Sequence, residues 1–239
     1  MRKEGNFHQP HKYVKMRVIE KYEQTNLNNN DVKWYLFDEQ LWVTKCKDYM
    51  EVDASIAEPV GSFNLLYESN DTILFDKVEG FETAIIYLSG IINNDILKEY
   101  SNVIMTGKKG NLLFAENNNV DFNFLSFIIY DENDDTLLAF PTDFNNQKDI
   151  VLHIVDDFGF VIRNHELSGW FLKKASEHVC ISQEHNKEIT PQILARYLKA
   201  LKLWEDNEDI TELEKLLAES MTKVNEFNCA LRECITNLL

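Results

Sequence analysis

The sequence predicts an α+β fold, in which an antiparallel β-sheet body with short packed helices is followed by a C-terminal antiparallel helical hairpin. Two observations lead to this prediction. Four apolar runs separated by acidic turns occupy residues 122–162, which is the pattern of consecutive strands. Beyond residue 190 the apolar residues recur every three or four positions, which is the spacing of amphipathic helices. The change of period divides the chain into a body of residues 1–186 and a hairpin of residues 187–239.

The first part of the body contains many aromatic and β-branched residues, which favour strands. Residues 12–22 predict an opening strand, although their mixed spacing also fits a short helix. The asparagine-rich run at residues 25–31 predicts a loop, because asparagine bonds its own backbone and tolerates left-handed conformations. Residues 32–43 predict one or two strands with a turn near Asp38. The apolar segment 81–90 fits a buried strand or a helix, and its periodicity does not separate the two.

An antiparallel meander is predicted between residues 122 and 162. Its strands are expected at residues 124–130, Thr136–Phe140, 150–155 and 158–162. The turns between them are acidic, so their carboxylates are expected to project from the ends of the sheet. From residue 166 the apolar residues change to helical spacing, which predicts a short helix over residues 166–175 laid on the sheet.

The C-terminal hairpin is predicted from two helix starts. Thr190 and Pro191 suit a helix N-terminus, because threonine can cap the first turn and proline fits the first helical position. A capping box at residues 211–214 begins a second helix after the acidic turn at residues 205–209. Both helices carry an apolar stripe, which can pack between them, on the sheet, or on a second copy of the chain as a homodimer.

The net charge of −16 is distributed unevenly. Residues 1–21 carry six Lys and Arg against two Glu, whereas residues 111–158 carry ten Asp and Glu against Lys148 alone. A field of this sign repels nucleic acid and anionic membranes, and it accelerates encounter with a basic protein surface. A surface whose charge only keeps the protein soluble would have the same composition.

Cysteine use and hydropathy predict a reduced, cytoplasmic compartment. Cys46, Cys180, Cys229 and Cys234 are scattered and form no CxxC pair. The basic residues at the N-terminus have no apolar run behind them, so no signal peptide is expected. No stretch approaches the roughly 18 apolar residues that a membrane helix needs.

No enzyme motif is found, and we expect neither catalysis nor a cofactor. The GxSxG, P-loop, GxGxxG, HExxH and kinase patterns are all absent. The turn at Asp131 begins like a calcium loop, but Thr136 stands where that loop needs glycine. His178, Cys180 and His185 match no structural zinc spacing, yet they are candidate metal ligands and leave a metal-assisted hydrolase as an alternative.

The residues predicted to bind a partner are six carboxylates and three aromatic anchors. They are Asp131, Glu132, Asp134, Asp135, Asp156 and Asp157, together with Phe122, Phe144 and Trp170. Carboxylates beside aromatic faces suit the arginine side chains of a basic protein. We therefore expect a non-enzymatic protein that occludes a basic partner. The alternative is a structural subunit that uses the C-terminal hairpin.

The stretch at residues 134–175 combines an acidic turn, a strand VLHIVDD, a further short strand, and an expected helix that carries Trp170, Phe171 and Leu172. In this combination it resembles the closing part of the SUKH superfamily, which is dominated by bacterial toxin-immunity proteins. The resemblance implies a stoichiometric inhibitor that binds a toxic enzyme, often a nuclease, through an acidic face. An anti-defence inhibitor would leave the same acidic pattern.

Overall fold

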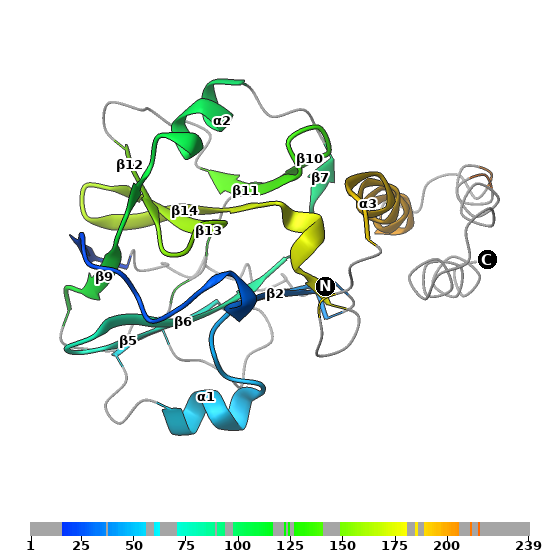
Figure 1. Cartoon of the computed structure of the whole chain (residues 1–239). Coiled ribbons are helices and arrows are strands. Elements are labelled where there is room, and N and C mark those ends of the chain that lie inside the picture. The colour runs from blue at the N-terminus through cyan, green and yellow to red at the C-terminus, as the bar shows by residue number, and fades with distance from the viewer. Residues whose placement is uncertain are drawn as a thin grey trace, which may run out of the picture.

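Three β-sheets dominate the part of the chain that the structure describes. The computed structural model describes residues 16–36, 38–55, 60–62, 71–88, 90–93, 98–116, 122, 124, 127–140, 149–180, 185, 189–205, 211 and 215. Within them, strands form sheets of seven, six and two strands, and the α-helices are α1 (Tyr49–Ser55), α2 (Lys98–Met105) and α3 (Pro191–Glu205). The predicted α+β class is therefore wrong, because the described chain is mostly β-structure (Figure 1).

The two large sheets lie face to face, with α1 and α2 outside them (Figure 1). The main core lies between the sheets, where the ring centroids of Phe81 and Phe160 are 5.3 Å apart. A second apolar cluster joins Ile104 of α2 to Phe171 on the outer face of the seven-stranded sheet. A third cluster places Val52 of α1 against the outer face of the six-stranded sheet. The layers therefore follow the order helix, sheet, sheet, helix.

The seven-stranded sheet contains all four strands of the predicted meander, but in a different order. It runs β7 (Ile92–Asn93), β10 (Phe127–Asp131), β11 (Thr136–Phe140), β14 (Glu166–Lys173), β13 (Phe158–Arg163), β12 (Asp149–His153) and β8 (Lys108–Lys109). Strands β10 and β11 form one antiparallel pair and β12 and β13 form another. The meander is wrong in its pairing, because β14 lies between β11 and β13 and pairs with both.

The helix predicted over residues 166–175 is also wrong, since most of this stretch forms strand β14. Trp170 faces the main core and Phe171 faces the cluster under α2, so the strand is buried on both faces. A strand buried on both faces has a nearly continuous apolar run instead of alternation. The preceding turn residues, Asn164 and His165, have φ of 53° and 63°, which is the type I′ geometry of a tight hairpin.

The six-stranded and two-stranded sheets come mainly from the first half of the chain. The larger runs β15 (Val179–Cys180), β2 (Val32–Tyr35), β3 (Gln40–Val43), β6 (Gly80–Tyr87), β5 (Thr72–Asp76) and β4 (Val60–Ser62). In the smaller, β1 (Val18–Lys21) pairs with β9 (Asn111–Phe114). The predicted opening strand and the two strands on either side of Asp38 are confirmed, and the ambiguous segment at residues 81–90 contributes to β6.

Helix α3 begins where the sequence indicates. Its first residue is Pro191, and the Thr190 hydroxyl accepts a hydrogen bond from the Ile193 backbone N–H at 3.3 Å. Leu194 and Leu198 are buried in the main core, so the apolar stripe of α3 packs on the sheets.

The second helix of the predicted hairpin falls largely outside the described residues, which include only Thr211 and Lys215 of that stretch. The structure therefore shows no helical hairpin among the residues it describes, and the fold class is corrected in this respect too. The predicted homodimer through the C-terminal helices depends on this second helix and stays a prediction. Of the helices described, none has the length and apolar character needed to cross a membrane.

The 3-10 helix η2 (Ala175–His178) connects the two large sheets. It follows β14 and leads directly into β15, which pairs in parallel with β2. Lys174, the residue before η2, has a left-handed backbone with φ of 49°. The end of the seven-stranded sheet at which β14 finishes is therefore joined covalently to the other large sheet.

Candidate functional site

Both acidic turns of the predicted site lie at one end of the seven-stranded sheet. Thr136 of β11 is opposite Lys173 of β14, and Phe158 of β13 is opposite Leu172. The turns before β11 and β13 therefore lie on either side of the exit from β14 into η2. We call this region the acidic end, and its carboxylates are Asp131, Glu132, Asp134, Asp135, Asp156, Asp157 and Glu177. The sequence predicted all of them except Glu177.

Asp135 fastens the β10–β11 turn to η2. Its carboxylate accepts hydrogen bonds from the Tyr130 hydroxyl at 2.8 Å, the Ser176 hydroxyl at 2.7 Å and the Ser176 backbone N–H at 3.0 Å. Its backbone carbonyl accepts a bond from the Ala175 N–H at 2.9 Å. Burial, followed by the charge of Asp135, raises the pKa of Tyr130, so the phenol remains a donor. The turn and η2 therefore form one structural unit.

Besides the half-buried Asp135, three carboxylates of this unit reach solvent. Asp134 and Glu177 are exposed and Glu132 is half-buried, whereas Asp131 is buried. Asp134 is partly engaged, because the Ser101 hydroxyl of α2 donates a hydrogen bond to its Oδ2 at 2.6 Å. We call Glu132, Asp134 and Glu177 the outward face of the acidic end.

Asp157 has the opposite environment, because it is buried among its partners. Its carboxylate accepts a hydrogen bond from Asn29 Nδ2 at 2.8 Å, and it lies 3.4 Å from His178 Nε2 and 3.6 Å from Lys174 Nζ. Burial by itself raises the pKa of Asp157, but His178 and the nearby lysine ammonium groups outweigh it and hold that pKa below its ordinary value. Asp157 therefore links the β12–β13 turn to η2 and to the short 3-10 helix η1 (Asn29–Asp31) that precedes β2.

His178 and His185 meet at a backbone carbonyl. His178 Nδ1 lies 3.2 Å and His185 Nε2 lies 2.9 Å from the Val32 carbonyl oxygen. The other ring nitrogen of His178, Nε2, is buried and lies beside Asp157 Oδ2, so the imidazole stands between the Val32 carbonyl and the Asp157 carboxylate. The third member of the candidate metal set, Cys180, is buried, and burial raises the pKa of its thiol to about 11. Within the described residues, no three His, Cys, Asp or Glu are grouped to hold a metal ion.

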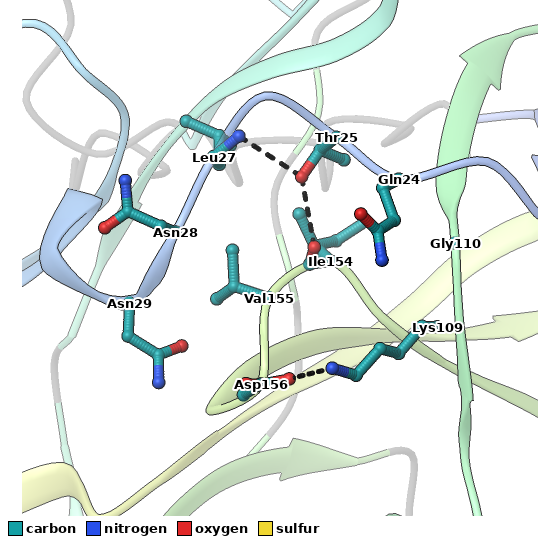
Figure 2. A pocket seen from close by; sticks show the side chains of 10 residues that line it. All are labelled: Gln24, Thr25, Leu27, Asn28, Asn29, Lys109, Gly110, Ile154, Val155 and Asp156. Atoms are coloured by element: carbon teal, nitrogen blue, oxygen red, sulfur yellow. Dashed lines mark hydrogen bonds and ion pairs between the residues drawn. The ribbon is translucent and has the colours of Figure 1, made fainter.

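A pocket of about 400 Å³ opens beside the β12–β13 turn (Figure 2). It is lined by Gln24, Thr25, Leu27, Asn28, Asn29, Lys109, Gly110, Ile154, Val155 and Asp156. Figure 2 shows Asn28 and Asn29 on one side and the ion pair of Lys109 with Asp156 on the other. The amide groups of Asn28 and Asn29 donate hydrogen bonds to the carboxylates of Asp31 and Asp157. On the other side, the hydrogen bond from Lys109 lowers the pKa of Asp156. The charge of Asp156 is therefore compensated.

Two of the three predicted aromatic anchors are core residues. Trp170 is 0% exposed and Phe122 is 4% exposed, and both belong to the main core. Trp170 lies in the middle of the sheet, opposite Ala139 on one side and Phe160 on the other. Neither side chain is accessible to a partner in this conformation, which corrects that part of the prediction. Phe144 lies outside the described residues.

Sequence reasoning missed the residues that hold the acidic end in place. Asn29 meets Asp157 across 128 positions of the chain, and Ser176 meets Asp135 across 41 positions. No local pattern indicates the first contact. The sequence does contain a sign of the second contact, because the change from apolar to polar residues after residue 173 marks the end of a buried segment, where Ser176 lies.

No family model matches the chain, and no curated protein matches it. The described part of residues 134–175 forms β11, β12, β13 and β14 and reaches the start of η2, so Trp170, Phe171 and Leu172 lie in a strand instead of a helix. The resemblance of this stretch to the SUKH superfamily stays a prediction.

Proposed function

We propose that this chain is a non-enzymatic binding protein that neutralises a basic protein partner by occluding it with the acidic end. The observation that supports this most is the outward face of Glu132, Asp134 and Glu177, whose turn and 3-10 helix are held together by Asp135. Because the backbone that carries them is held in one conformation, binding through these carboxylates costs little ordering of the turn and of η2. Their common negative charge accelerates encounter with a basic protein.

The partner class that fits best is a basic enzyme that acts on nucleic acid. Such an enzyme uses lysine and arginine to hold phosphates, and carboxylates compete well for the same side chains. The resemblance of residues 134–175 to the SUKH superfamily implies the same kind of partner, a toxic enzyme and often a nuclease. We assign the encounter to the cytoplasm, in agreement with the free, buried thiols of Cys46 and Cys180.

Affinity capture with a charge-reversed variant tests the proposal. Glu132→Lys/Glu177→Lys reverses two carboxylates of the outward face and leaves Asp135 in place. The matched control Asp53→Lys/Glu79→Lys makes the same change of net charge at exposed positions of α1 and the β5–β6 turn. We expect the wild type and the control to capture the same basic protein from the native host, and the reversed variant to lose most of it.

Binding kinetics then test the electrostatic mechanism on the captured protein. The reversed variant should associate about tenfold more slowly at low salt, and the difference should shrink at high ionic strength, because salt screens exposed charges. The activity of the captured enzyme should fall to zero near one equivalent of the wild type. Equal capture and equal association rates for the wild type and the reversed variant would contradict the proposal.

A further inference from the structure

The outer face of the six-stranded sheet carries a group of tyrosines next to α1. Tyr35 of β2, Gln40 of β3 and Tyr87 of β6 are neighbours across the sheet. Tyr49, the first residue of α1, donates a hydrogen bond from its hydroxyl to Gln40 Oε1 at 3.0 Å, and Trp42 Nε1 donates to the same oxygen at 2.8 Å. We call Tyr35, Tyr49 and Tyr87 the tyrosine face.

The rings of Tyr35 and Tyr49 are held by Trp42, and all three tyrosines are only partly covered. Trp42 makes edge contacts with Tyr35, at 5.6 Å between centroids and 83° between planes, and with Tyr49, at 4.8 Å and 65°. Trp42 is 5% exposed, whereas the three tyrosines are half-buried. Met50, beside Tyr49, is 83% exposed. Tyrosine and methionine are enriched where proteins bind one another, so the exposed part of this surface has the composition of an interface.

A negative charge borders the tyrosine face. Asp38 lies in the β2–β3 turn and is exposed. The turn joins Tyr35 to Gln40, which pair directly across β2 and β3, so Asp38 lies at the end of the sheet next to the tyrosine face. Burial raises the pKa of Tyr35 and of Tyr49, and the charge of Asp38 adds to the increase in both. A guanidinium group can stack on an aromatic ring while it pairs with a carboxylate, which makes arginine the complementary side chain.

We propose that the tyrosine face is a docking site for an arginine side chain of a basic partner protein. The inference rests on the proposed function for the charge of that partner, but the surface belongs to the other large sheet and is separate from the acidic end. Arginine is preferred to lysine, because its cation is planar and more weakly hydrated. The partner would then be held at two points, by charge at the acidic end and by stacking at the tyrosine face.

Binding of a fluorescently labelled peptide, Gly-Arg-Gly-Arg-Gly, to the full chain tests this site against Gly-Lys-Gly-Lys-Gly, which has the same charge. We expect the arginine peptide to bind about threefold tighter. Tyr35→Leu removes one ring but keeps apolar cover for Trp42, and it should weaken the arginine peptide about fivefold. Asp38→Asn should weaken it about threefold at low salt, whereas the matched control Asp53→Asn should leave its dissociation constant unchanged.

Equal binding of the two peptides, or unchanged binding by both Tyr35→Leu and Asp38→Asn, would overturn the inference. If Glu132→Lys/Glu177→Lys weakens the arginine peptide and Tyr35→Leu does not, the peptide binds at the acidic end, which overturns the inference and leaves the proposed function intact. If Tyr35→Leu abolishes the arginine preference while Glu132→Lys/Glu177→Lys captures the partner normally, the tyrosine face is supported and the acidic end is not. Asp38→Asn changes only an exposed side chain. If Tyr35→Leu does not fold, the affinity of Asp38→Asn for the arginine peptide therefore tests the inference.

Discussion

The two acidic turns at one end of the seven-stranded sheet have similar compositions and different roles. The β10–β11 turn uses Asp135 as an anchor to η2 and presents its remaining exposed carboxylates to solvent. The β12–β13 turn buries Asp157 among partners and compensates Asp156 through Lys109. A carboxylate in an acidic turn is therefore a surface group or a structural joint according to what lies opposite it, and the residues opposite come from distant parts of the chain.

Of the changes to the two turns, removal of Asp157 should have the largest effect on stability. Asp157→Ala removes the acceptor of the half-buried Asn29 amide and the carboxylate beside the buried Nε2 of His178. Breaking a buried, charged contact of this kind costs about 3 kcal/mol. We expect the free energy of unfolding, measured by urea denaturation, to fall by about that amount. The control Asp134→Ala removes an exposed carboxylate of the other turn and should change it by less than about 0.5 kcal/mol. Equal losses in the two variants would mean that the turns do not differ.

Acid should weaken the interactions of the Asp157 carboxylate. The pKa of Asp157 lies below its ordinary value in the fold, so its interactions stabilise the protein above the pKa of the unfolded chain and are lost as the pH falls through the folded pKa. Below about pH 4, the free energy of unfolding of Asp157→Asn should therefore depend less on pH than that of the wild type. Parallel curves for the two proteins in denaturation series would contradict this.

Asp71, the residue before β5, contrasts with Asp157 because its pKa is raised in the fold instead of lowered. Its carboxylate accepts bonds from the backbone N–H groups of Phe124 and Tyr87, but burial raises its pKa from 3.8 to about 6. The protonated form is therefore favoured in the fold, and its stabilising contribution is lost as the pH rises from 3.8 through about 6. In denaturation series over this pH range, the free energy of unfolding of Asp71→Asn should therefore not decline from this cause, whereas that of Asp157→Asn should still do so.

Much of the local structure could be predicted from the sequence, because local patterns determine it. The turn near Asp38 and the strand Thr136–Phe140 follow from turn residues and from apolar runs, and the start of α3 follows from Thr190 and Pro191. Strand β14 could not be predicted in the same way, because burial of both its faces removes the alternation that marks a strand. The position of β14 between β11 and β13 depends on pairings that no local pattern records.

The candidate site could be predicted in composition but not in roles. The sequence located the carboxylates, because acidic turns at strand ends are visible in it. It did not separate Asp157 from Glu132, since the groups that bury and pair Asp157 lie elsewhere, Asn29 being 128 positions away. It also offered Trp170 as a surface anchor, whereas the middle of a seven-stranded sheet leaves that side chain 0% exposed.

A smaller effect is expected at the anchor of the β10–β11 turn. Asp135→Asn removes the charge of the acceptor: its Oδ1 can still accept from the Ser176 N–H and its NH₂ can donate to the Ser176 hydroxyl, so charge-assisted bonds become weaker neutral ones. The free energy of unfolding should fall by about 1.5 kcal/mol in thermal or urea denaturation, whereas Asp134→Asn should leave it nearly unchanged. Hydrogen exchange at the Ser176 amide should become faster in Asp135→Asn alone. Unchanged exchange at that amide would mean that Asp135 does not fasten the turn.

The smallest effect on stability is expected for Lys109→Met, which removes the compensation of Asp156. The two side chains are 64% and 63% exposed, so loss of their ion pair should change the free energy of unfolding by no more than about 0.5 kcal/mol. The charge of Asp156 would then add to the acidic end, and association with a basic partner should become about twofold faster at low salt and unchanged at high salt. Lys47→Met makes the same change of net charge at an exposed position before α1 and serves as the control. If only Lys109→Met associates faster, the ion pair with Lys109 normally keeps Asp156 from attracting the partner as Glu132 does. Equal association rates for the two variants would exclude the β12–β13 turn from the binding surface.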